Sequence, residues 1–460
     1  MAPPSNLKSK IHYPKSSYDV VIIGGGLSGL AAAVELALNG ADVALCEQAP
    51  KLGGRCYSYV NETTGDVVDN GQHILIGAYH NTLRYLEVIG TRHFLKAQSK
   101  LKLPLFHPAR GLVAFEVSSL PQPLGVTSGM LRYKHLSLND RQKVLKVWFD
   151  LNNWNETLEK KLSLLTVEQW LKSLHQSEEA RKALWYPLAI SMMNELPERA
   201  SALLFARSIR AAFFGKKSDS TILIPIIGQS ELYVHSAVAL LNEKGVHISL
   251  NTQVESIIAE DSKIVGVRLN NGKNIKAEYV VGAVPWFSLP KLIPPAWKKE
   301  KPFLHLNQFH SSPILSIHLW FDKEFMADDF VGIADRSIQW VFNKRRILKG
   351  GGKTHSYLSV VISAAYNVVN FSRKRLVELA LKDLREAYPE SRNASLVHAV
   401  VVKEKRATFS PTNETEPLRP NAETPIKNFF LAGDWTNTGL PATIEGAVMS
   451  GFHAAKLISS

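Results

Sequence analysis

The stretch that decides the fold is DVVIIGGGLSGLAAAVELALNGADVALCE, residues 19–47. Its first five residues are an apolar run typical of a buried strand, and residues 24–29 form a glycine-rich turn. Residues 30–40 have a helix-like pattern that ends at Gly40, and residues 41–47 predict a second strand. A strand, glycine-rich turn, helix and strand within about 30 residues indicate the βαβ unit of a dinucleotide-binding fold.

The glycines of this turn match the GxGxxG motif at Gly24, Gly26 and Gly29. The first allows the tight turn, the second lets the backbone approach a pyrophosphate, and the third lets the helix pack closely on the strand. Glu47 ends the second strand 18 residues after Gly29, where a carboxylate can accept hydrogen bonds from a ribose. Together these features predict a site for FAD or NAD, with the phosphates at the helix N-terminus.

The rest of the chain alternates between two kinds of pattern. Residues 135–215 carry helix-spaced apolar side chains, whereas residues 312–364 are mostly β in pattern. Residues 222–285 are mixed, with a helix expected near 229–243 followed by four short strands, and the turn Asn270-Asn271-Gly272 predicts a hairpin. A second helix is expected at 372–387, then a strand at 428–434 and a closing helix from about Pro441.

These patterns predict an α/β protein in which a Rossmann-like nucleotide-binding domain is interrupted by a mixed α+β substrate domain. The nucleotide-binding domain is assigned to residues 18–100, 222–300 and 395–460. The substrate domain, expected to bind a lipid, is assigned to residues 101–221 and 301–394. Residues 1–17 are expected to form a flexible basic tail.

The net charge of the chain is +13 at a length of 460 residues. Seven Lys and Arg against one acid lie between Arg92 and Lys134, and nine with no acid lie between Arg336 and Val377. Because both segments fall mainly in the expected substrate domain, the charge favours an anionic membrane surface as partner and gives no support to nucleic acid. An ordinary solvated basic face is the alternative.

No apolar span long enough to cross a membrane occurs, and the first 17 residues lack the apolar core of a secretory signal. Only two cysteines are present, and their spacing fits neither a disulfide framework nor a CxxC motif. A cytoplasmic location is therefore predicted. The basic segments further suggest that the protein attaches peripherally to the inner face of the plasma membrane.

Two further motifs decide between FAD and NAD. KLGGR at 51–55 follows the acidic strand, and LAGDW at 431–435 precedes a helix rich in glycine and alanine. This pairing resembles the FAD-dependent amine oxidase and phytoene desaturase superfamily, which implies the amine oxidase type of fold and FAD as cofactor. The absence of a cysteine near the C-terminal motif favours non-covalent FAD, and no metal is expected. The resemblance implies cofactor contacts at Gly53, Gly54, Arg55, Val254, Asp434, Thr443, Ile444 and Glu445, besides the GxGxxG glycines and Glu47. The side chain of Glu445 is expected to cap the closing helix or to orient the flavin loop.

The likeness is closer at DNGQHILIGAY (69–79), NELPERASA (194–202), QWVF (339–342) and GLPATIEGA (439–447). These stretches resemble the hydroxysqualene dehydroxylases, bacterial enzymes of squalene and hopanoid synthesis. That family implies reductive dehydroxylation of a C30 isoprenoid alcohol, with hydride passing from reduced flavin to an allylic cation and an external reductant for the FAD. A general acid would help the hydroxyl leave. His73 is the candidate, with Gln72 as a second polar candidate and a purely structural histidine as the alternative.

Three other functions stay open at this point. A carotenoid or phytoene desaturase would use the same cofactor in the oxidative direction. A flavin amine oxidase is disfavoured because Thr443 stands where an aromatic residue is usual and Leu315 where a lysine is. A non-catalytic isoprenoid escort protein would have little reason to keep a full set of flavin motifs.

Overall fold

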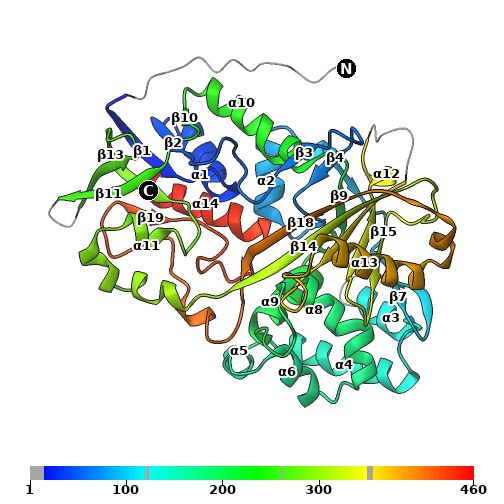
Figure 1. The fold of residues 1–460 in the computed structure, drawn as a ribbon. Helices are drawn as coiled ribbons and strands as arrows, with labels where there is room; N and C mark the ends of the chain where they lie inside the picture. Colours follow the sequence, from blue (N-terminus) through cyan, green and yellow to red (C-terminus); the bar gives the residue numbers. More distant parts are fainter. Residues whose placement is uncertain (1–14, 119, 121–123, 261–262, 350–355, 460) are drawn as a thin grey trace.

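The computed structural model in Figure 1 describes residues 15–118, 120, 124–260, 263–349 and 356–459. The predicted basic tail lies almost entirely outside these residues, and Ser17 already belongs to the first strand. Two large sheets organise the described chain.

The first sheet contains the βαβ unit. Strand β1 (Ser17–Ile23) lies between β2 (Val43–Cys46) and β13 (Asn274–Gly282), parallel to both. Val20 and Ile22 enter one apolar core, and Val21 and Ile23 enter another. Burial on both faces explains why this strand is a continuous apolar run. The other strands are β10 (His247–Ser249), β11 (Val254–Glu260), β12 (Lys263–Leu269) and β19 (Phe429–Leu431).

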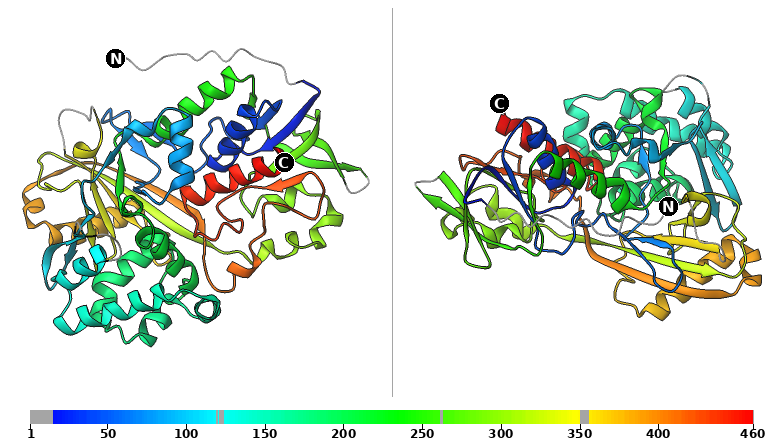
Figure 2. Two further views of the ribbon diagram at one scale, coloured as in Figure 1. Left: turned by 180° about the vertical axis from the view of Figure 1, so that it is seen from behind. Right: turned by 90° about the horizontal axis from the view of Figure 1, so that it is seen from above.

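Segments far apart in the sequence complete this half of the molecule. Helix α1 (Leu27–Leu38) packs beside the C-terminal helix α14 (Ile444–Ser459), as both views of Figure 2 show. Helices α2 (His80–Val88) and α10 (Ser236–Glu243) contribute to the same apolar core. The hairpin predicted at Asn270-Asn271-Gly272 is confirmed, since β12 and β13 pair antiparallel on either side of it.

The second sheet has the order β18–β14–β17–β16–β15–β7–β8. Its long central strand β14 (Ser311–Phe321) runs antiparallel to both neighbours. Helix α13 (Arg373–Ala387) covers one face, where Leu315, Ile317 and Leu319 point. The other strands are β18 (Leu396–Phe409), β17 (Ser356–Ile362), β16 (Trp340–Asn343), β15 (Phe330–Ile333), β7 (Lys102–His107) and β8 (Gly111–Glu116).

The helical block predicted at 135–215 is confirmed, and it packs against the β7–β8 end of the second sheet (Figure 1). It holds α4 (Leu138–Asn152), α5 (Glu156–Leu162), α6 (Val167–Ser173), α7 (Glu178–Ala180), α8 (Tyr186–Met193) and α9 (Ala202–Phe213), and α3 (Leu124–Arg132) precedes it. Short helices α11 (Leu289–Leu292) and α12 (Lys344–Ile347) lie elsewhere.

Smaller β elements connect the two halves. A hairpin pairs β3 (Ser58–Val60) with β4 (Val67–Asp69). A three-stranded sheet joins β5 (Leu75–Ile76), β9 (Ile222–Pro225) and β6 (Leu95–Ala97). The hairpin and β5 flank residues 70–74, so the GQH motif lies on a short loop between them.

Strand β18 lies across the predicted division into domains. Residues 395–460 are predicted to belong to the nucleotide-binding part, whereas β18 pairs along β14 from Leu396 to Phe409 in the second sheet. Its side chains are mostly half-buried, so no sharp change in hydropathy marks where one domain ends. The division into domains stays a prediction.

Candidate flavin site

The glycine-rich turn leaves the N-terminus of α1 free for an anion. Gly24 adopts φ +106°, which a residue with a side chain rarely adopts, and a Cβ on Gly29 would lie 1.9 Å from the Gly24 carbonyl oxygen. Gly26 is the N-cap residue, without a side-chain cap and without an acid in the first turn. A Cβ on Gly26 would meet no protein atom within 4 Å. The backbone N–H groups and the positive end of the helix therefore face open space.

Glu47 lies at the edge of this turn, as the sequence predicts. Its carboxylate accepts hydrogen bonds from the backbone N–H groups of Gly25 at 2.7 Å and of Ala49 at 2.8 Å. The segment leading to Val254 is fastened to the same place, because Thr252 N–H donates to the Glu47 carbonyl at 2.9 Å. Glu47 and Val254 are thus close to the turn, although their contacts with a ribose or an adenine stay predictions.

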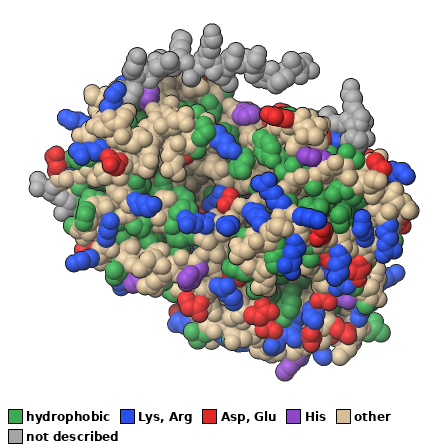
Figure 3. Space-filling model, in the orientation of Figure 1, with side chains coloured by type: hydrophobic (Ala, Val, Ile, Leu, Met, Phe, Trp, Pro, Cys, Tyr) green, Lys and Arg blue, Asp and Glu red, His purple; other side chains and the backbone are tan. Residues whose placement is uncertain are grey.

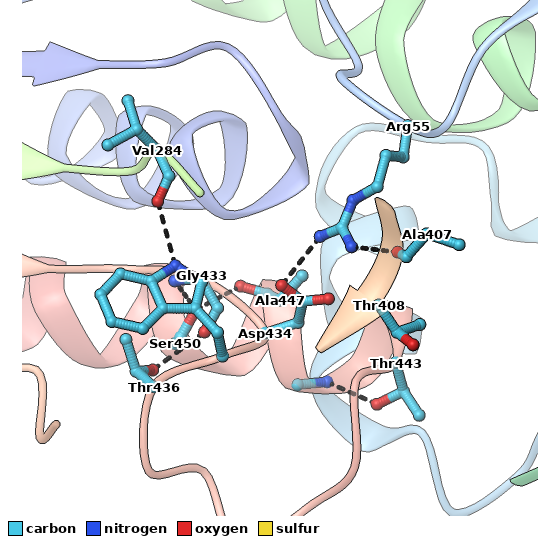
Figure 4. A network of polar contacts seen from close by, with 12 residues as sticks. Arg55, Val284, Ala407, Thr408, Gly433, Asp434, Thr436, Thr443, Ala447 and Ser450 are labelled. Carbon is cyan, nitrogen blue, oxygen red and sulfur yellow. Dashed lines mark hydrogen bonds and ion pairs between the residues drawn. The ribbon is translucent and has the colours of Figure 1, made fainter. Parts of the chain in front are cut away.

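The GGR loop folds directly onto the glycine-rich turn. Gly53 N–H donates to the Gly25 carbonyl at 2.8 Å, and a Cβ on Gly54 would lie 3.2 Å from the Gly26 Cα. Arg55 then reaches the C-terminal motif, where its guanidinium contacts the Asp434 carboxylate at 2.8 Å and the Ala407 carbonyl (Figure 4). Arg55 thus contacts two residues that are far from it in the sequence, Ala407 at a separation of 352 positions and Asp434 at a separation of 379.

The C-terminal motif is held rigidly by its own partners. Gly433 N–H donates to the Ser450 hydroxyl at 2.8 Å, and the Trp435 indole donates to the Val284 carbonyl at 3.0 Å (Figure 4). The buried guanidinium of Arg419 donates to the carbonyl groups of Asp434, Trp435 and Thr436. Sequence reasoning missed Arg419, because no motif surrounds it.

The start of α14 has a different role from the one expected for Glu445. The Thr443 hydroxyl accepts a hydrogen bond from Gly446 N–H at 3.0 Å and so caps α14. The buried Glu445 carboxylate accepts from the backbone and side chains of Asn81 and Thr82, at 2.7–2.9 Å. It therefore caps α2 and not the closing helix. Cofactor contacts from the backbone of Thr443, Ile444 and Glu445 stay predictions.

The loop 70–74 packs against the GGR loop. Asn70 N–H donates to the Tyr57 carbonyl at 2.9 Å, and its side-chain amide donates to the Arg55 carbonyl at 2.8 Å. Gln72 and His73 are half-buried at the tip of this loop. Burial lowers the pKa of His73 to about 4, and Asp69 opposes this shift. At neutral pH the imidazole is therefore uncharged, with one N–H to donate and one nitrogen to accept.

Arg55 and His73 both keep accessible surface beside the GGR loop. The Arg55 side chain keeps 40% of its surface accessible, and His73 is half-buried. A bound molecule can therefore reach part of each side chain. The open space at Gly26, the unused α1 N-terminus and the Arg55 guanidinium suit a diphosphate, so these residues fit FAD.

Sequence reasoning also missed the partners of the loop 70–74. Lys344 contacts both Asp69 and Gln72 from α12, and it is nearly inaccessible to solvent. In the sequence, Lys344 and Arg345 are part of the basic segment between Arg336 and Val377. In the structure both are buried in ion pairs, with Asp69 and Asp66. Within the described ranges, no group of three or more His, Cys, Asp or Glu side chains is arranged to hold a metal.

Comparison with known proteins agrees with this geometry. Residues 27–459 match the sequence profile of the flavin containing amine oxidoreductases, so the chain belongs to that family, and it is an oxidoreductase with FAD as cofactor. The expected fold class is confirmed by an oxidoreductase from Methanosarcina mazei, with a TM-score of 0.73 at 18% identity over 95% of this chain and 99% of that one. A putrescine oxidase double mutant has the same TM-score, at 18% identity over 97% of this chain and 100% of its own.

The similar curated proteins include enzymes of isoprenoid metabolism, as the sequence motifs suggested. A hydroxysqualene dehydroxylase of Sinorhizobium fredii is 29% identical over 96% of this chain and 98% of its own length. That of Zymomonas mobilis is 28% identical over 95% and 98%. A 15-cis-phytoene desaturase of an Oncidium hybrid is 26% identical over 97% of this chain and 78% of its own.

Proposed function

We propose that this chain reduces hydroxysqualene to squalene. The observation that carries the proposal is the position of the loop 70–74, which is hydrogen-bonded to the backbone of Arg55 and has the half-buried polar residues Gln72 and His73 at its tip. A reductive dehydroxylase needs such groups beside its cofactor, because a hydroxyl leaves poorly until it is protonated or strongly hydrogen-bonded. The similarity to two hydroxysqualene dehydroxylases over nearly the whole chain supports the same reading.

The features of an amine oxidase are not in place. Residue 443 is a threonine whose hydroxyl caps α14, so this position carries no aromatic ring. On β14, Leu315 points into the core under α13, and the neighbouring position on the opposite face is Ser316. Strand β14 carries no lysine on either face. These features support an alcohol substrate over an amine.

The partly buried apolar residues on the core that Ile74 joins suit a long hydrocarbon. Ile74 follows His73 directly and packs against the core of the helical block. The other partly buried apolar residues on that core include Leu188, Met192, Ile314 and Trp340. Such surface holds an isoprenoid chain through burial of apolar area, at about 25 cal/mol per Å², while it excludes water from the reacting carbon.

Loss of the hydroxyl and gain of hydride consume one proton and release water. When bound, reduced FAD supplies the hydride. We assign the proton-donating role to His73, whose N–H can hydrogen-bond the departing oxygen, and a supporting donor role to the Gln72 amide. Because its pKa is lowered, the His73 imidazole is neutral before the reaction. Negative charge brought close to the imidazole would raise that pKa and favour uptake of the proton.

The test is an anaerobic single turnover. Enzyme reduced with dithionite is mixed with hydroxysqualene, and the lipids are analysed by mass spectrometry. Squalene in an amount equal to the enzyme-bound FAD is expected. Oxidised enzyme is mixed with phytoene in parallel. A desaturated product there, with no squalene in the first reaction, would show a desaturase instead, and a purified protein that cannot take up FAD would favour an escort role.

We also propose that the protein docks on anionic membranes to obtain its substrate. No described helix has the length and apolar character to cross a bilayer. Around α3, the exposed apolar residues Leu124, Leu131 and Leu138 alternate with exposed Arg132 and Lys134, a composition that suits a bilayer surface. Figure 3 shows Lys and Arg spread over the face it presents rather than gathered in one patch. Co-sedimentation with phosphatidylglycerol vesicles that weakens with salt is expected, and a salt-insensitive result would contradict docking.

The second basic segment contributes less to docking than its composition suggests. Lys344 and Arg345 are buried in ion pairs, Arg336 pairs with Glu386 at 2.5 Å, and Arg346 pairs with Asp329 at 3.1 Å. The acids come from other parts of the chain, so the local count of charges overstated the free charge. An external reductant for the FAD remains part of the proposal.

A further inference from the structure

A buried ion pair lies directly behind the loop 70–74. Lys344 Nζ is 2.8 Å from Asp69 Oδ2, and the two side chains are 1% and 3% exposed. Lys344 begins α12, whereas Asp69 ends β4, so the pair joins the second sheet to the hairpin that precedes the loop. Figure 1 shows α12 beside β3 and β4. A buried pair of this kind is weak evidence for stability by itself, because desolvation offsets much of the attraction.

The same ammonium group also fixes the orientation of Gln72. Lys344 Nζ donates to Gln72 Oε1 at 2.5 Å. An ammonium has three N–H donors and no acceptor, so Gln72 must turn its amide oxygen toward Lys344 and its NH2 group away. That NH2 group donates to the His73 carbonyl at 3.2 Å. One cation therefore holds the oxygen end of the Gln72 amide and leaves the NH2 end on the side of His73.

The chain of contacts continues to the groups that fit the cofactor. Asn70, next to Asp69, donates to the Arg55 carbonyl at 2.8 Å, and Arg55 contacts Asp434 at 2.8 Å. Gln229 fastens the loop from the other side: its backbone N–H donates to Asp69 Oδ1 at 3.0 Å and its side chain to the Gly71 carbonyl. Asp69 thus has partners on both carboxylate oxygens, and the loop has little freedom to move.

We propose that Lys344 is a positioning residue of the flavin site, which acts through Gln72. It rests on the proposed function in one respect, namely that Gln72 and His73 face the bound cofactor. Lys344 orients the Gln72 donors toward the substrate hydroxyl, and Asp69 neutralises the buried ammonium and ties it to the loop. Neither Lys344 nor Asp69 takes part in a bond-breaking step.

The chain itself offers a matched control. Arg345 follows Lys344 on α12 and pairs with Asp66 of the same hairpin, through two contacts of which one is 2.8 Å. The Asp66 carboxylate also accepts from the Trp320 indole at 2.7 Å. The side chains of this second pair are 10% and 3% exposed, and the pair joins the same two elements, but Arg345 binds Asp66 where Lys344 binds Asp69 and Gln72. A purely structural role would make the two pairs equivalent.

The experiment is a double-mutant cycle on the FAD-loaded enzyme. The variants are Gln72→Ala alone, Lys344→Met with Asp69→Asn, Arg345→Met with Asp66→Asn, and each of these two pair variants combined with Gln72→Ala. Removal of both partners avoids an unpaired buried charge, so these variants are expected to fold. Two quantities are measured: the single-turnover rate with hydroxysqualene, and the midpoint potential of the flavin by dye equilibration, which requires no substrate.

The Lys344 pair variant is expected to lower the rate at least tenfold and to shift the flavin potential in the same direction as Gln72→Ala. Adding Gln72→Ala to it should change neither quantity further, because both changes remove the same oriented amide. The single-turnover rate of the Arg345 pair variant should stay within twofold of that of the parent, and its effects should add to those of Gln72→Ala. Equal effects of the two pairs, or additive effects of Lys344 and Gln72, would overturn the proposal. If hydroxysqualene is not the substrate, neither the parent nor any variant turns it over. The midpoint potential of the flavin then still shows whether Lys344 acts through Gln72.

Discussion

Alanine at Gly26 is expected to abolish FAD binding without unfolding the protein, whereas alanine at Gly29 should damage the fold itself. The two glycines belong to one motif three residues apart, but their surroundings differ. A Cβ at position 26 meets nothing within 4 Å, while a Cβ at position 29 would lie 1.9 Å from a backbone oxygen and 3.3 Å from the Ala283 Cβ. The backbone of Gly26 is extended, with φ −71° and ψ 178°, which alanine adopts without strain.

The magnitudes follow from these contacts. Gly26→Ala exchanges a moderate N-cap residue for a poor one, which costs about 0.5–1 kcal/mol of unfolding free energy. Its methyl group fills the space through which a pyrophosphate would approach the α1 N-terminus, so a loss of about a hundredfold or more in FAD affinity, roughly 3 kcal/mol, is expected. Gly29→Ala forces α1 away from β1, and overpacking of this kind costs about 1–3 kcal/mol or more.

The assay has two parts. Urea unfolding of the apoprotein, followed by tryptophan fluorescence, gives the stability of each variant, and titration with FAD, followed by quenching of flavin fluorescence, gives the affinity. The reasoning predicts a stable, colourless Gly26→Ala protein and a destabilised Gly29→Ala protein. A Gly26→Ala protein that binds FAD with parental affinity would refute the assignment of this turn to the pyrophosphate.

Three further predictions concern single side chains. His73→Ala should lower the single-turnover rate by about 10²–10⁴-fold with FAD still bound, and unchanged turnover would remove the acid role. Glu445→Ala should lower the stability of the apoprotein by roughly 2–4 kcal/mol in urea, since two buried N–H groups of α2 lose their acceptor, and Glu445→Gln should lower it less. Burial lowers the pKa of His318 to about 4, below its ordinary 6.5, so the unfolded chain takes up a proton that the folded chain does not, and stability falls as the pH drops through that window. The loss amounts to roughly 3 kcal/mol once the pH is below 4. His318→Gln should make the profile less steep between pH 7 and 4.5, where His73 and His135 still contribute because burial also lowers their pKa values to about 4. An unchanged slope would contradict this origin.

Local features of the fold were predictable from the sequence, because local physics determines them. The strand, turn and helix of residues 19–47 follow from hydropathy and glycine placement, and the hairpin at Asn270-Asn271-Gly272 from turn chemistry. The cofactor motifs that contain Arg55 and Asp434 could also be recognised from the sequence, since each is a short contiguous stretch.

Features that depend on distant partners were not predictable. Lys344 looked like one charge in a surface run because Asp69 lies 275 positions away, and the ion pair exists only once β16 and β4 have been brought together. Glu445 looked like a cap for its own helix, yet α2 supplies its donors from 363 and 364 positions away. The pairing of β18 with β14 also could not be predicted, because half-buried side chains fit either surface.

The central claim is that this chain delivers hydride to a hydroxyl-bearing isoprenoid. The most direct measurement is an anaerobic single turnover of the reduced enzyme with hydroxysqualene in D2O, in which the hydride position of reduced flavin exchanges with solvent. The account predicts squalene that carries one deuterium per molecule, formed in step with reoxidation of the flavin. Recovery of unchanged hydroxysqualene while the reduced enzyme stays reduced would contradict it.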